Sequence, residues 1–211
     1  MNVMIIIQAR MTSTRLPGKV LMDLAGKPML QHVIERARAG LPDAKLVVAT
    51  PPGEAQWPIH DLCKRLEIAS ESPDAPENDV LARYHHAAMN EHVNTLIVRI
   101  TSDCPLLDPA LLRQAVEAGG DWTTTDYVRA RRAIEVFPLD VLLRAHRKAT
   151  SAHDREHVCT WMYDAANGMR CVLIDDDQTN ASVDTAWDLE RARRVLERAP
   201  GATWNDVDTA V

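Results

Sequence analysis

The chain has 211 residues, of which 46% are hydrophobic and 26% are charged, a balance typical of a globular domain with an apolar core. Its formal net charge of −6 argues against general nucleic-acid binding, and no window of the sequence is long and apolar enough for a membrane span. The four cysteines are widely spaced without a C-x-x-C pair, and the first residues do not resemble a signal peptide, so we expect a cytoplasmic protein with reduced thiols.

Strand and helix patterns alternate over about the first 120 residues. The strands share short apolar runs, and they are predicted at 3–9, 44–50, 67–70 and 94–101. The helices share one apolar face, and they are predicted at 27–41, at 57–66, at 76–92 with Asn78 or Asp79 as N-cap, and from Pro109 behind the N-cap Asp108. This alternation predicts an α/β fold with three layers and a mainly parallel sheet.

The pattern changes after Asp121. Strands are predicted at 121–128, 132–138 and 169–176, and helices at 139–149, 152–167 and 185–199. The sequence contains no internal repeat and no low-complexity linker. We therefore expect one domain over residues 1–211, with a small elaboration at about 122–170.

The loop after the first predicted strand is rich in cations and hydrogen-bond donors. It holds Arg10, Arg15 and Lys19, three hydroxyl side chains at 12–14, and backbone N–H groups near Gly18. Ligands of open parallel sheets bind beyond the carboxyl ends of the strands, so this loop suits a polyanion such as a triphosphate. The phosphate-binding motifs G-x-x-x-x-G-K-[ST] and G-x-G-x-x-G are both absent. The alternative is a solvated loop whose cations pair with nearby acids.

Two carboxylates lie at similar positions farther along the chain. Asp103 follows the strand 94–101, where a carboxylate can hold Mg²⁺ together with substrate phosphates. Asp184 lies between a short apolar stretch and a predicted helix, and its alternative role is a helix N-cap shared with Thr185. The sequence therefore offers Asp103 and Asp184 as a magnesium site, whereas Asp108 is better explained as a cap.

Three further motifs have simpler explanations. Residues 153–157 match the metalloprotease motif H-x-x-E-H, but no third ligand is evident, and a capped helix that starts after Ser151 explains them more simply. The D-x-D at 175–177 occurs in many metal-dependent glycosyltransferases, yet it lies in a polar run typical of a turn. His85 and His86 are adjacent on a helix and cannot face one metal ion.

The motif IIIQARMTSTRLPGKVLMDLAGKPML closely resembles the start of the bacterial cytidylyltransferases that activate sugar acids, such as the 3-deoxy-manno-octulosonate and acylneuraminate enzymes. Four shorter motifs are similar to the branch known as spore coat polysaccharide biosynthesis protein F: VRITSDCPLLDP, NDVLARYHHAA, REHV and SVDTAWDLE. The matches run in consistent order from residue 1 to about 198. This resemblance implies a Rossmann-like nucleotidyltransferase fold and the Mg²⁺-assisted transfer of CMP from CTP to a sugar acid.

The resemblance also implies roles for particular residues. The nucleotide would be bound by Gln8, Ala9, Arg10, Ser13, Thr14, Arg15, Lys19, Arg83, Thr101 and Ser102. Arg10, Lys19 and Asp103 would be catalytic, and Asp103 and Asp184 would hold the magnesium ion. This agrees with the chemistry, because attack on a phosphorus atom chiefly needs positioning and neutralisation of charge.

The chain departs from the family around 127–137, where a Gly-Leu-Asp part of a longer segment is missing. In the family this region faces the acceptor and often the partner of a homodimer. Glu135 remains at a matching position, and Arg129, Arg131 and Arg132 are local additions that suit a carboxylate, phosphate or phosphonate. Their alternative role is a solvated basic strand edge. Arg129 and Glu135 are therefore the candidates for acceptor binding.

We expect a Mg²⁺-dependent cytidylyltransferase that binds CTP and a small anionic acceptor and serves surface-polysaccharide synthesis, with no nucleic-acid or membrane partner. The first alternative is a nucleotide-sugar-dependent glycosyltransferase, because fold does not fix function. The second is a non-catalytic nucleotide-binding protein. The presence of Arg10, Lys19, Asp103 and Asp184 together argues against the second, since a binding remnant needs no second metal ligand.

Overall fold

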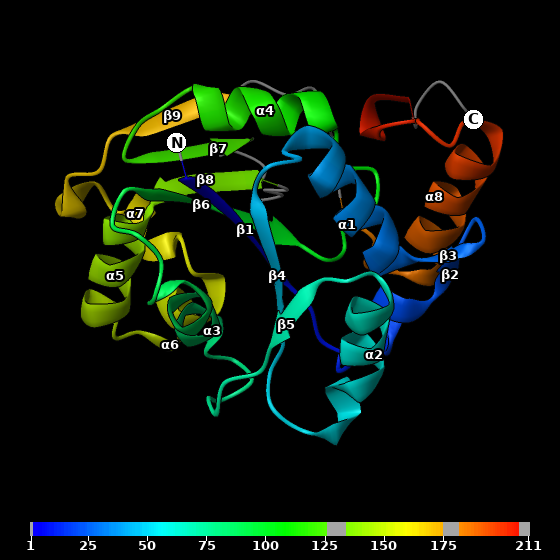
Figure 1. The fold of residues 1–211 in the computed structure, drawn as a ribbon, viewed down its shortest axis with the longest axis horizontal. Helices are drawn as coiled ribbons and strands as arrows, with labels where there is room; N and C mark the ends of the chain where they lie inside the picture. Colours follow the sequence, from blue (N-terminus) through cyan, green and yellow to red (C-terminus); the bar gives the residue numbers. More distant parts are fainter. Residues whose placement is uncertain (1, 126–133, 175–181, 207–211) are drawn as a thin grey trace.

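The computed structural model describes residues 2–125, 134–174 and 182–206. Within them the main sheet has the strand order β5-β4-β1-β6-β8-β7-β9, with helices on both faces (Figure 1). Its strands are β1 Asn2–Gln8, β4 Lys45–Ala49, β5 Ala69–Glu71, β6 Thr95–Thr101, β7 Trp122–Thr125, β8 Ile134–Pro138 and β9 Cys171–Ile174. β8 runs antiparallel to both of its neighbours, and the other neighbouring pairs are parallel. The predicted three-layer, mainly parallel α/β fold is confirmed.

The helices form two groups, one on each face of the sheet (Figure 1). The first group consists of α1 Met29–Gly40, α2 Trp57–Arg65, α4 Pro109–Glu117 and α8 Ala186–Arg198. The second consists of α3 Val80–Ala88, α5 Leu139–Lys148, α6 Ala152–His157 and α7 Thr160–Tyr163. Short 3-10 helices are η1 Lys19–Leu21, η2 Glu54–Gln56, η3 Ala165–Asn167 and η4 Trp204–Asp206. In the described ranges, no helix has the length and apolar character that crossing a membrane requires.

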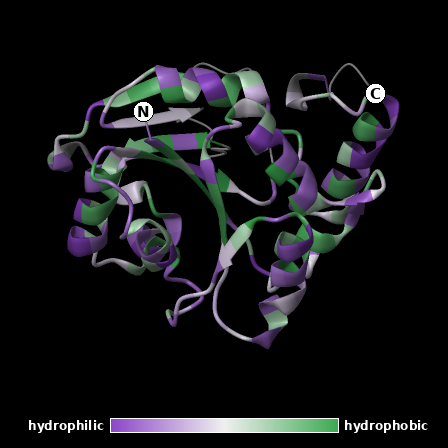
Figure 2. Ribbon diagram, viewed as in Figure 1, coloured by the Kyte–Doolittle hydropathy of each residue, from purple (hydrophilic) through white to green (hydrophobic). Residues whose placement is uncertain are grey.

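The composition of β1 follows from its place at the centre of the sheet. Ile5 and Ile7 belong to the core that includes α1, whereas Met4 and Ile6 belong to the core that includes α3, and all four are fully buried. A strand covered on both faces needs apolar side chains at every position, which explains the unbroken run in the sequence. Each such buried side chain contributes roughly 1.5–3 kcal/mol. Figure 2 shows hydrophobic residues along the central strands, with hydrophilic residues on the surrounding helices.

The predicted helix 152–167 is wrong as one element, because the chain breaks it into α6, α7 and η3. The break is at Val158, which has φ 60° and ψ −61° and lies fully buried in the core beside α3 and α5. The N–H of Cys159 donates to the carbonyl of His157 at 2.6 Å, so the chain makes a γ-turn around Val158. Packing of Val158 and Cys159 into the core thus overrides the helical pattern, and it ends α6 at His157.

A small hairpin that the sequence did not predict connects the cationic loop to α1. Its strands are β2 Asp23–Leu24 and β3 Lys27–Pro28, and both turn residues, Ala25 and Gly26, have positive φ as such two-residue turns require. Arg193 of α8 donates to the carbonyl of Asp23 at 2.8 Å. The hairpin therefore helps to fix α8, which begins directly after Asp184 and Thr185.

The region after Asp121 extends the main sheet. β7 covers the first half of the predicted strand 121–128, and the second half lies outside the described residues. β8 inserts between β6 and β7, which places Glu135 directly opposite Arg99. The helices α5, α6 and α7 of the predicted elaboration then cover one face of this sheet (Figure 1).

Candidate active site

A cavity of about 230 Å³ lies at the carboxyl ends of β1 and β6. These strands are adjacent and parallel, with Gln8 paired to Thr101, so the loops that follow them leave the sheet from the same edge. The N–H of Ser102 donates to the carbonyl of Gln8 at 3.2 Å and ties the two loops together. The edge of the sheet thus forms the floor of the cavity.

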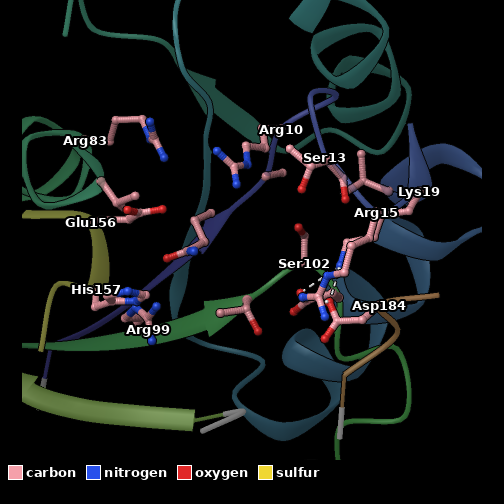
Figure 3. Close-up of a pocket in the computed structure, with 17 residues that line it drawn as sticks. Arg10, Ser13, Arg15, Lys19, Arg83, Arg99, Ser102, Glu156, His157 and Asp184 are labelled. Carbon is pink, nitrogen blue, oxygen red and sulfur yellow. Dashed lines mark hydrogen bonds and ion pairs between the residues drawn. The ribbon is translucent and has the colours of Figure 1, made fainter. Parts of the chain in front are cut away.

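Every residue predicted to bind nucleotide or metal lines this cavity. These residues are Gln8, Ala9, Arg10, Ser13, Thr14, Arg15, Lys19, Arg83, Thr101, Ser102, Asp103 and Asp184. Figure 3 shows Arg10, Ser13, Arg15 and Lys19 converging from the loop after β1, with Arg83 facing them from α3. The structure therefore brings together in one place residues from four separate parts of the chain.

The ammonium of Lys19 lies between the two predicted metal ligands. Its Nζ is 3.0 Å from Oδ2 of Asp103, 3.1 Å from Oδ1 of Asp184 and 2.7 Å from the carbonyl of Val183. The N–H of Val183 donates in turn to the carbonyl of Asp103 at 2.8 Å. The two carboxylates are thus held together by a side-chain cation and by a main-chain hydrogen bond.

Burial and charge act in opposite directions on the groups of this cluster. Burial alone would lower the pKa of Lys19, but the Asp103 and Asp184 carboxylates raise it above its usual value. Burial alone would raise the pKa of Asp184, but Lys19 and Arg15 hold it below its usual value. Lys19 therefore stays protonated and Asp184 stays ionised, and the pair of acids forms a site for positive charge.

The two arginines of the loop, Arg10 and Arg15, pair with nearby acids, as expected if this were only a solvated surface loop. They also border the cavity, however. Arg15 lies 2.9 Å from Asp184, and its side chain is 65% exposed. Arg10 lies 2.9 Å from Glu77, just before α3. Arg83 is buried and donates to the carbonyl of Glu77 at 2.6 Å. Glu77 thus holds Arg10 through its carboxylate and Arg83 through its main-chain carbonyl.

A second cavity of about 710 Å³ adjoins the first. Arg15, Arg99, Thr101, Asp103, His157 and Asp184 line both of them. The second cavity extends past His153, Thr160 and Tyr163 of α6 and α7. The two carboxylates therefore lie where the smaller cavity meets the wider one.

Arg99, Glu156 and His157 line the first cavity and were missed by the sequence analysis. The sequence did contain a signal that Arg99 has a special role, because it is the only charged residue within the buried strand TLIVRIT. Its partner is Glu135, which is fully buried, bonds to Arg99 and to the hydroxyl of Tyr163, and borders neither of these two cavities. The other acceptor candidate, Arg129, lies outside the described residues together with Arg131 and Arg132.

The competing cap interpretation of Asp184 is wrong. Thr185 is the N-cap of α8, and it forms a capping box with Asp188. The side chain of Asp184 is thereby left to Lys19, Arg15 and Ser182. Asp108, in contrast, is the N-cap of α4 as predicted, and its carboxylate accepts the N–H of Ala110 at 2.7 Å.

The simpler explanations of residues 153–157 and of His85 hold, whereas that of residues 175–177 is not tested. Ser151 is the N-cap of α6, so 153–157 starts a capped helix. In the described part of the chain, no three His, Cys, Asp or Glu side chains are grouped to hold a metal ion. His85 stacks on His146 with ring centroids 3.9 Å apart. Residues 175–177 lie outside the described residues. All four cysteines are described, and none of them forms a disulfide, in agreement with the expected reduced thiols.

Comparison with known proteins identifies similar chains. The model of a family described as cytidylyltransferase matches residues 4–198. An uncharacterized protein of Methanocaldococcus jannaschii is 32% identical over 179 residues, which are 83% of this chain and 72% of that protein. The 3-deoxy-manno-octulosonate cytidylyltransferase of Geobacter sulfurreducens is 37% identical over 116 residues, which are 55% of this chain and 44% of that enzyme. The match therefore spans less than half the length of this relative.

Solved structures show the same fold. A cytidylyltransferase from Leptospira borgpetersenii superposes with a TM-score of 0.87 at 24% identity, covering 99% of this chain and 93% of that one. A CMP:2-keto-3-deoxy-manno-octonic acid synthetase complexed with CTP has a TM-score of 0.72 at 19% identity, covering 94% of this chain and 99% of that one. The nucleotidyltransferase type of the predicted fold is thereby confirmed.

Proposed function

This chain belongs to the cytidylyltransferase family, and from that premise we propose that it transfers CMP from CTP to a hydroxyl group of a small sugar acid. The observation that carries this proposal is the cluster of Lys19, Asp103 and Asp184, which lies beneath a cationic loop at the edge of a parallel sheet. A bound triphosphate needs cations that neutralise its charge, and the paired carboxylates can hold the metal ion that transfer at phosphorus requires.

In the proposed reaction, the acceptor oxygen attacks the α-phosphorus of CTP in line with the bond to the leaving group. A new P–O bond forms to the acceptor, the bond between the α-phosphorus and the bridging oxygen breaks, and pyrophosphate leaves. The hydroxyl proton passes to solvent. Arg10, Arg15 and Lys19 supply the positive charge that the triphosphate and the departing pyrophosphate require.

The chain's residues fit a magnesium ion. Asp103 and Asp184 already hold a cation, the Lys19 ammonium, between them, and Mg²⁺ is commonly bound by one or two carboxylates together with substrate phosphates. When bound there, Mg²⁺ supplies charge neutralisation at the α-phosphate and polarisation of the acceptor hydroxyl. Lys19 lines the same cavity as Arg10 and Arg15, so its ammonium is available to a phosphate oxygen when it does not bridge the carboxylates.

Support for a sugar acid as the acceptor comes from relatives named 3-deoxy-manno-octulosonate cytidylyltransferase, which is an enzyme that acts on a sugar acid.

We further propose that the reaction serves surface-polysaccharide synthesis in the cytoplasm and that the protein works as a homodimer. The mass of the particle in solution, measured by light scattering, tests the dimer.

The test of the reaction is an assay for pyrophosphate. The protein is incubated with Mg²⁺, each of the four nucleoside triphosphates, and a panel of sugar acids, polyols and phosphonates. We expect release with CTP and a carboxylate-bearing acceptor. Asp103→Asn should abolish most of this release, whereas Asp140→Asn, the same change on the exposed side of α5, should leave it unchanged.

Two results would overturn the proposal. Release of a nucleoside diphosphate from a nucleotide-sugar, with no pyrophosphate from any pair, would establish the glycosyltransferase alternative. Binding of nucleotide without turnover of any pair, and with equal affinity in Asp103→Asn with and without Mg²⁺, would establish a non-catalytic protein.

A further inference from the structure

Arg99 is a cation at the junction of the two cavities, and we propose that it binds the carboxylate of the acceptor. This inference rests on the proposed function and assigns the part of the site that recognises the acceptor. Arg99 borders both cavities although its side chain is only 10% exposed. Figure 3 shows it beside His157, across the cavity from Lys19 and Arg15.

The position of Arg99 on β6 directs it toward the wider cavity. Val98 and Ile100 pack into the core that includes α1 and α4, whereas Ile97 packs into the core that includes α5 and α7. Since side chains alternate along a strand, Arg99 and Thr101 face the same side as Ile97. Arg99 is two residues before Thr101, or roughly 7 Å along the strand, and Asp103 is two residues beyond Thr101. A ligand held by Arg99 therefore lies next to the carboxylate pair.

Arg99 is fixed in this position by a buried partner. Glu135 is opposite it in the antiparallel pair of β6 and β8 and accepts a hydrogen bond from Nη1 of Arg99 through Oε2. The hydroxyl of Tyr163 donates to the other oxygen, Oε1, so both oxygens of this carboxylate are engaged. Burial alone would lower the pKa of Arg99, but the Glu135 carboxylate raises it, and the guanidinium stays charged.

The guanidinium still has unused hydrogen-bonding capacity. Nε of Arg99 is buried and has no acceptor among the described residues. Buried donors in folded proteins are almost always paired, so an unpaired donor in a buried cation is uncommon. The buried Nε is out of reach of a ligand, and the part of the guanidinium that borders the cavities is the part that can bind an anion.

The charges around the junction make such a cation necessary. Asp103 and Asp184 repel an acceptor that carries its own carboxylate. Arg15 and Arg99 are each paired with one acid, but Arg15 lies on an exposed loop, whereas Arg99 is anchored inside the sheet. A planar guanidinium matches the two oxygens of a carboxylate, which would set the neighbouring hydroxyl of a sugar acid toward the α-phosphorus beside Asp103.

The variants must separate binding from folding. Replacing Arg99 alone would leave the Glu135 carboxylate buried without its cation, so the test uses the pair Arg99→Gln/Glu135→Gln, which places two neutral amides opposite each other. Glu135→Gln alone keeps the Arg99 cation. Arg113→Gln, an exposed arginine on α4 that donates to the carbonyl of Ala39, is the matched control.

Binding is measured by calorimetry in the presence of Mg²⁺ and α,β-methylene CTP, a substrate analogue that cannot react. The probes are 3-deoxy-manno-octulosonate, D-gluconate, its neutral counterpart sorbitol, and methylphosphonate. We expect the wild-type protein and Arg113→Gln to bind at least one of the two acids in preference to sorbitol. The double variant should bind that acid about 10- to 100-fold more weakly, as expected for loss of a charged hydrogen bond. Its affinity for the CTP analogue should be unchanged, and Glu135→Gln should keep the preference for the acid.

Several outcomes would overturn the assignment of Arg99. The double variant and the wild type could bind the acid with equal affinity, or the wild type could bind sorbitol and the acids with equal affinity. The wild type could also bind neither acid, or bind methylphosphonate alone. In each of these cases, binding of the CTP analogue would leave the nucleotide part of the proposed function intact. A wild-type protein that does not bind the analogue would instead refute the proposed function itself.

Discussion

Lys19 and Asp184 form an ion pair of 3.1 Å although 165 positions separate them in the sequence. Lys19 begins η1 after Gly18, whose φ of 71° turns the chain back toward the sheet, and Asp184 directly precedes the N-cap of α8. The pair therefore joins the start of the chain to its last helix. It also places a cation where the proposed reaction needs a metal ion.

Removal of Lys19 should make the stability of the protein depend on magnesium. Lys19→Met leaves the Asp103 and Asp184 carboxylates side by side without a cation, so we expect a loss of about 1–3 kcal/mol in metal-free buffer. Mg²⁺ should then stabilise the variant more than the wild type, in which Lys19 competes for the same carboxylates. Urea unfolding with and without Mg²⁺ measures both effects. Lys27→Met, which removes an exposed pair with Glu35, is the control, and an equal response to Mg²⁺ in both variants would contradict the prediction.

Arg10 should matter for nucleotide binding and little for folding. Its ion pair with Glu77 is more than one-third exposed on both sides, and such pairs contribute about 0–1 kcal/mol. Arg10→Gln should therefore unfold like the wild type but bind CTP about tenfold more weakly, because a charged contact to phosphate is lost. Calorimetry with the unreactive CTP analogue measures the affinity. Arg144→Gln on α5 should change neither quantity, and an unaltered affinity in Arg10→Gln would remove this residue from the nucleotide site.

Arg155 should stabilise the wall of the wider cavity. Its Nε and Nη2 donate to Oδ2 of Asp79 at 2.9 and 2.7 Å, and Asp79 is also the N-cap of α3. Arg155→Gln should cost about 1–3 kcal/mol, because a charged, largely buried pair is broken and α6 is released from α3. The KM for the acceptor should rise more than the KM for CTP. Arg147→Gln, which replaces an exposed arginine of α5, provides the comparison. An equal rise of both KM values in Arg155→Gln would show a general loss of structure instead.

Stability should fall as the pH decreases from about 7 to about 5. Burial lowers the pKa values of His85 and His146, and the charge of neighbouring residues, including Arg155 and Arg147, lowers them further. The unfolded chain therefore binds protons on these residues at a higher pH than the folded chain does, so the free energy of unfolding decreases as the pH falls below their ordinary pKa of about 6.5. His146→Phe keeps an aromatic ring against His85 without the charge. Urea unfolding of this variant should show a weaker pH dependence over that range; an unchanged slope would exclude this histidine as a cause.

Gly40 should not tolerate a side chain. A Cβ at this position would lie 2.8 Å from Cδ2 of Leu112 and 3.0 Å from the carbonyl oxygen of Pro109, where α1 packs against α4. Gly40→Ala should destabilise the protein by about 1–3 kcal/mol through overpacking. Gly201→Ala, which meets no atom within 4 Å, should be nearly neutral. Thermal unfolding compares the two, and equal melting temperatures would show that the helices can separate without cost.

The convergence of the predicted nucleotide- and metal-binding residues on one cavity could be predicted from the sequence for a physical reason. Arg10, Lys19 and Asp103 lie in the segments that follow apolar strands, and in a parallel sheet the carboxyl ends of neighbouring strands meet at one edge. Local order along the chain was therefore enough to infer that these residues converge. The hydrogen bonds of Lys19 to both carboxylates were not predictable, since they depend on how α8 packs.

The acceptor side was harder to predict, because it depends on strand pairing and on a turn. Arg99 and Glu135 become partners only when β8 inserts antiparallel beside β6, and the sequence pattern gives no register for that pairing. The γ-turn at Val158 separates α6 from α7, although the residues around it keep a helical apolar pattern. Tertiary packing decides both features, and neither has a local signal.

Under the proposed function, the insertion of β8 also divides substrate recognition between the two halves of the chain. The cationic loop comes from residues before 20, whereas Glu135 and Tyr163, which hold Arg99, come from β8 and α7. Under the proposed function, selectivity for the acceptor can thus be redesigned at Glu135, Tyr163 and the turn at Val158, while the cationic loop after β1 is left unchanged. In the reaction that we propose, the loop after β1 would serve the nucleotide and the region of β8 and α7 would serve the acceptor, with β6 as the strand that both contact.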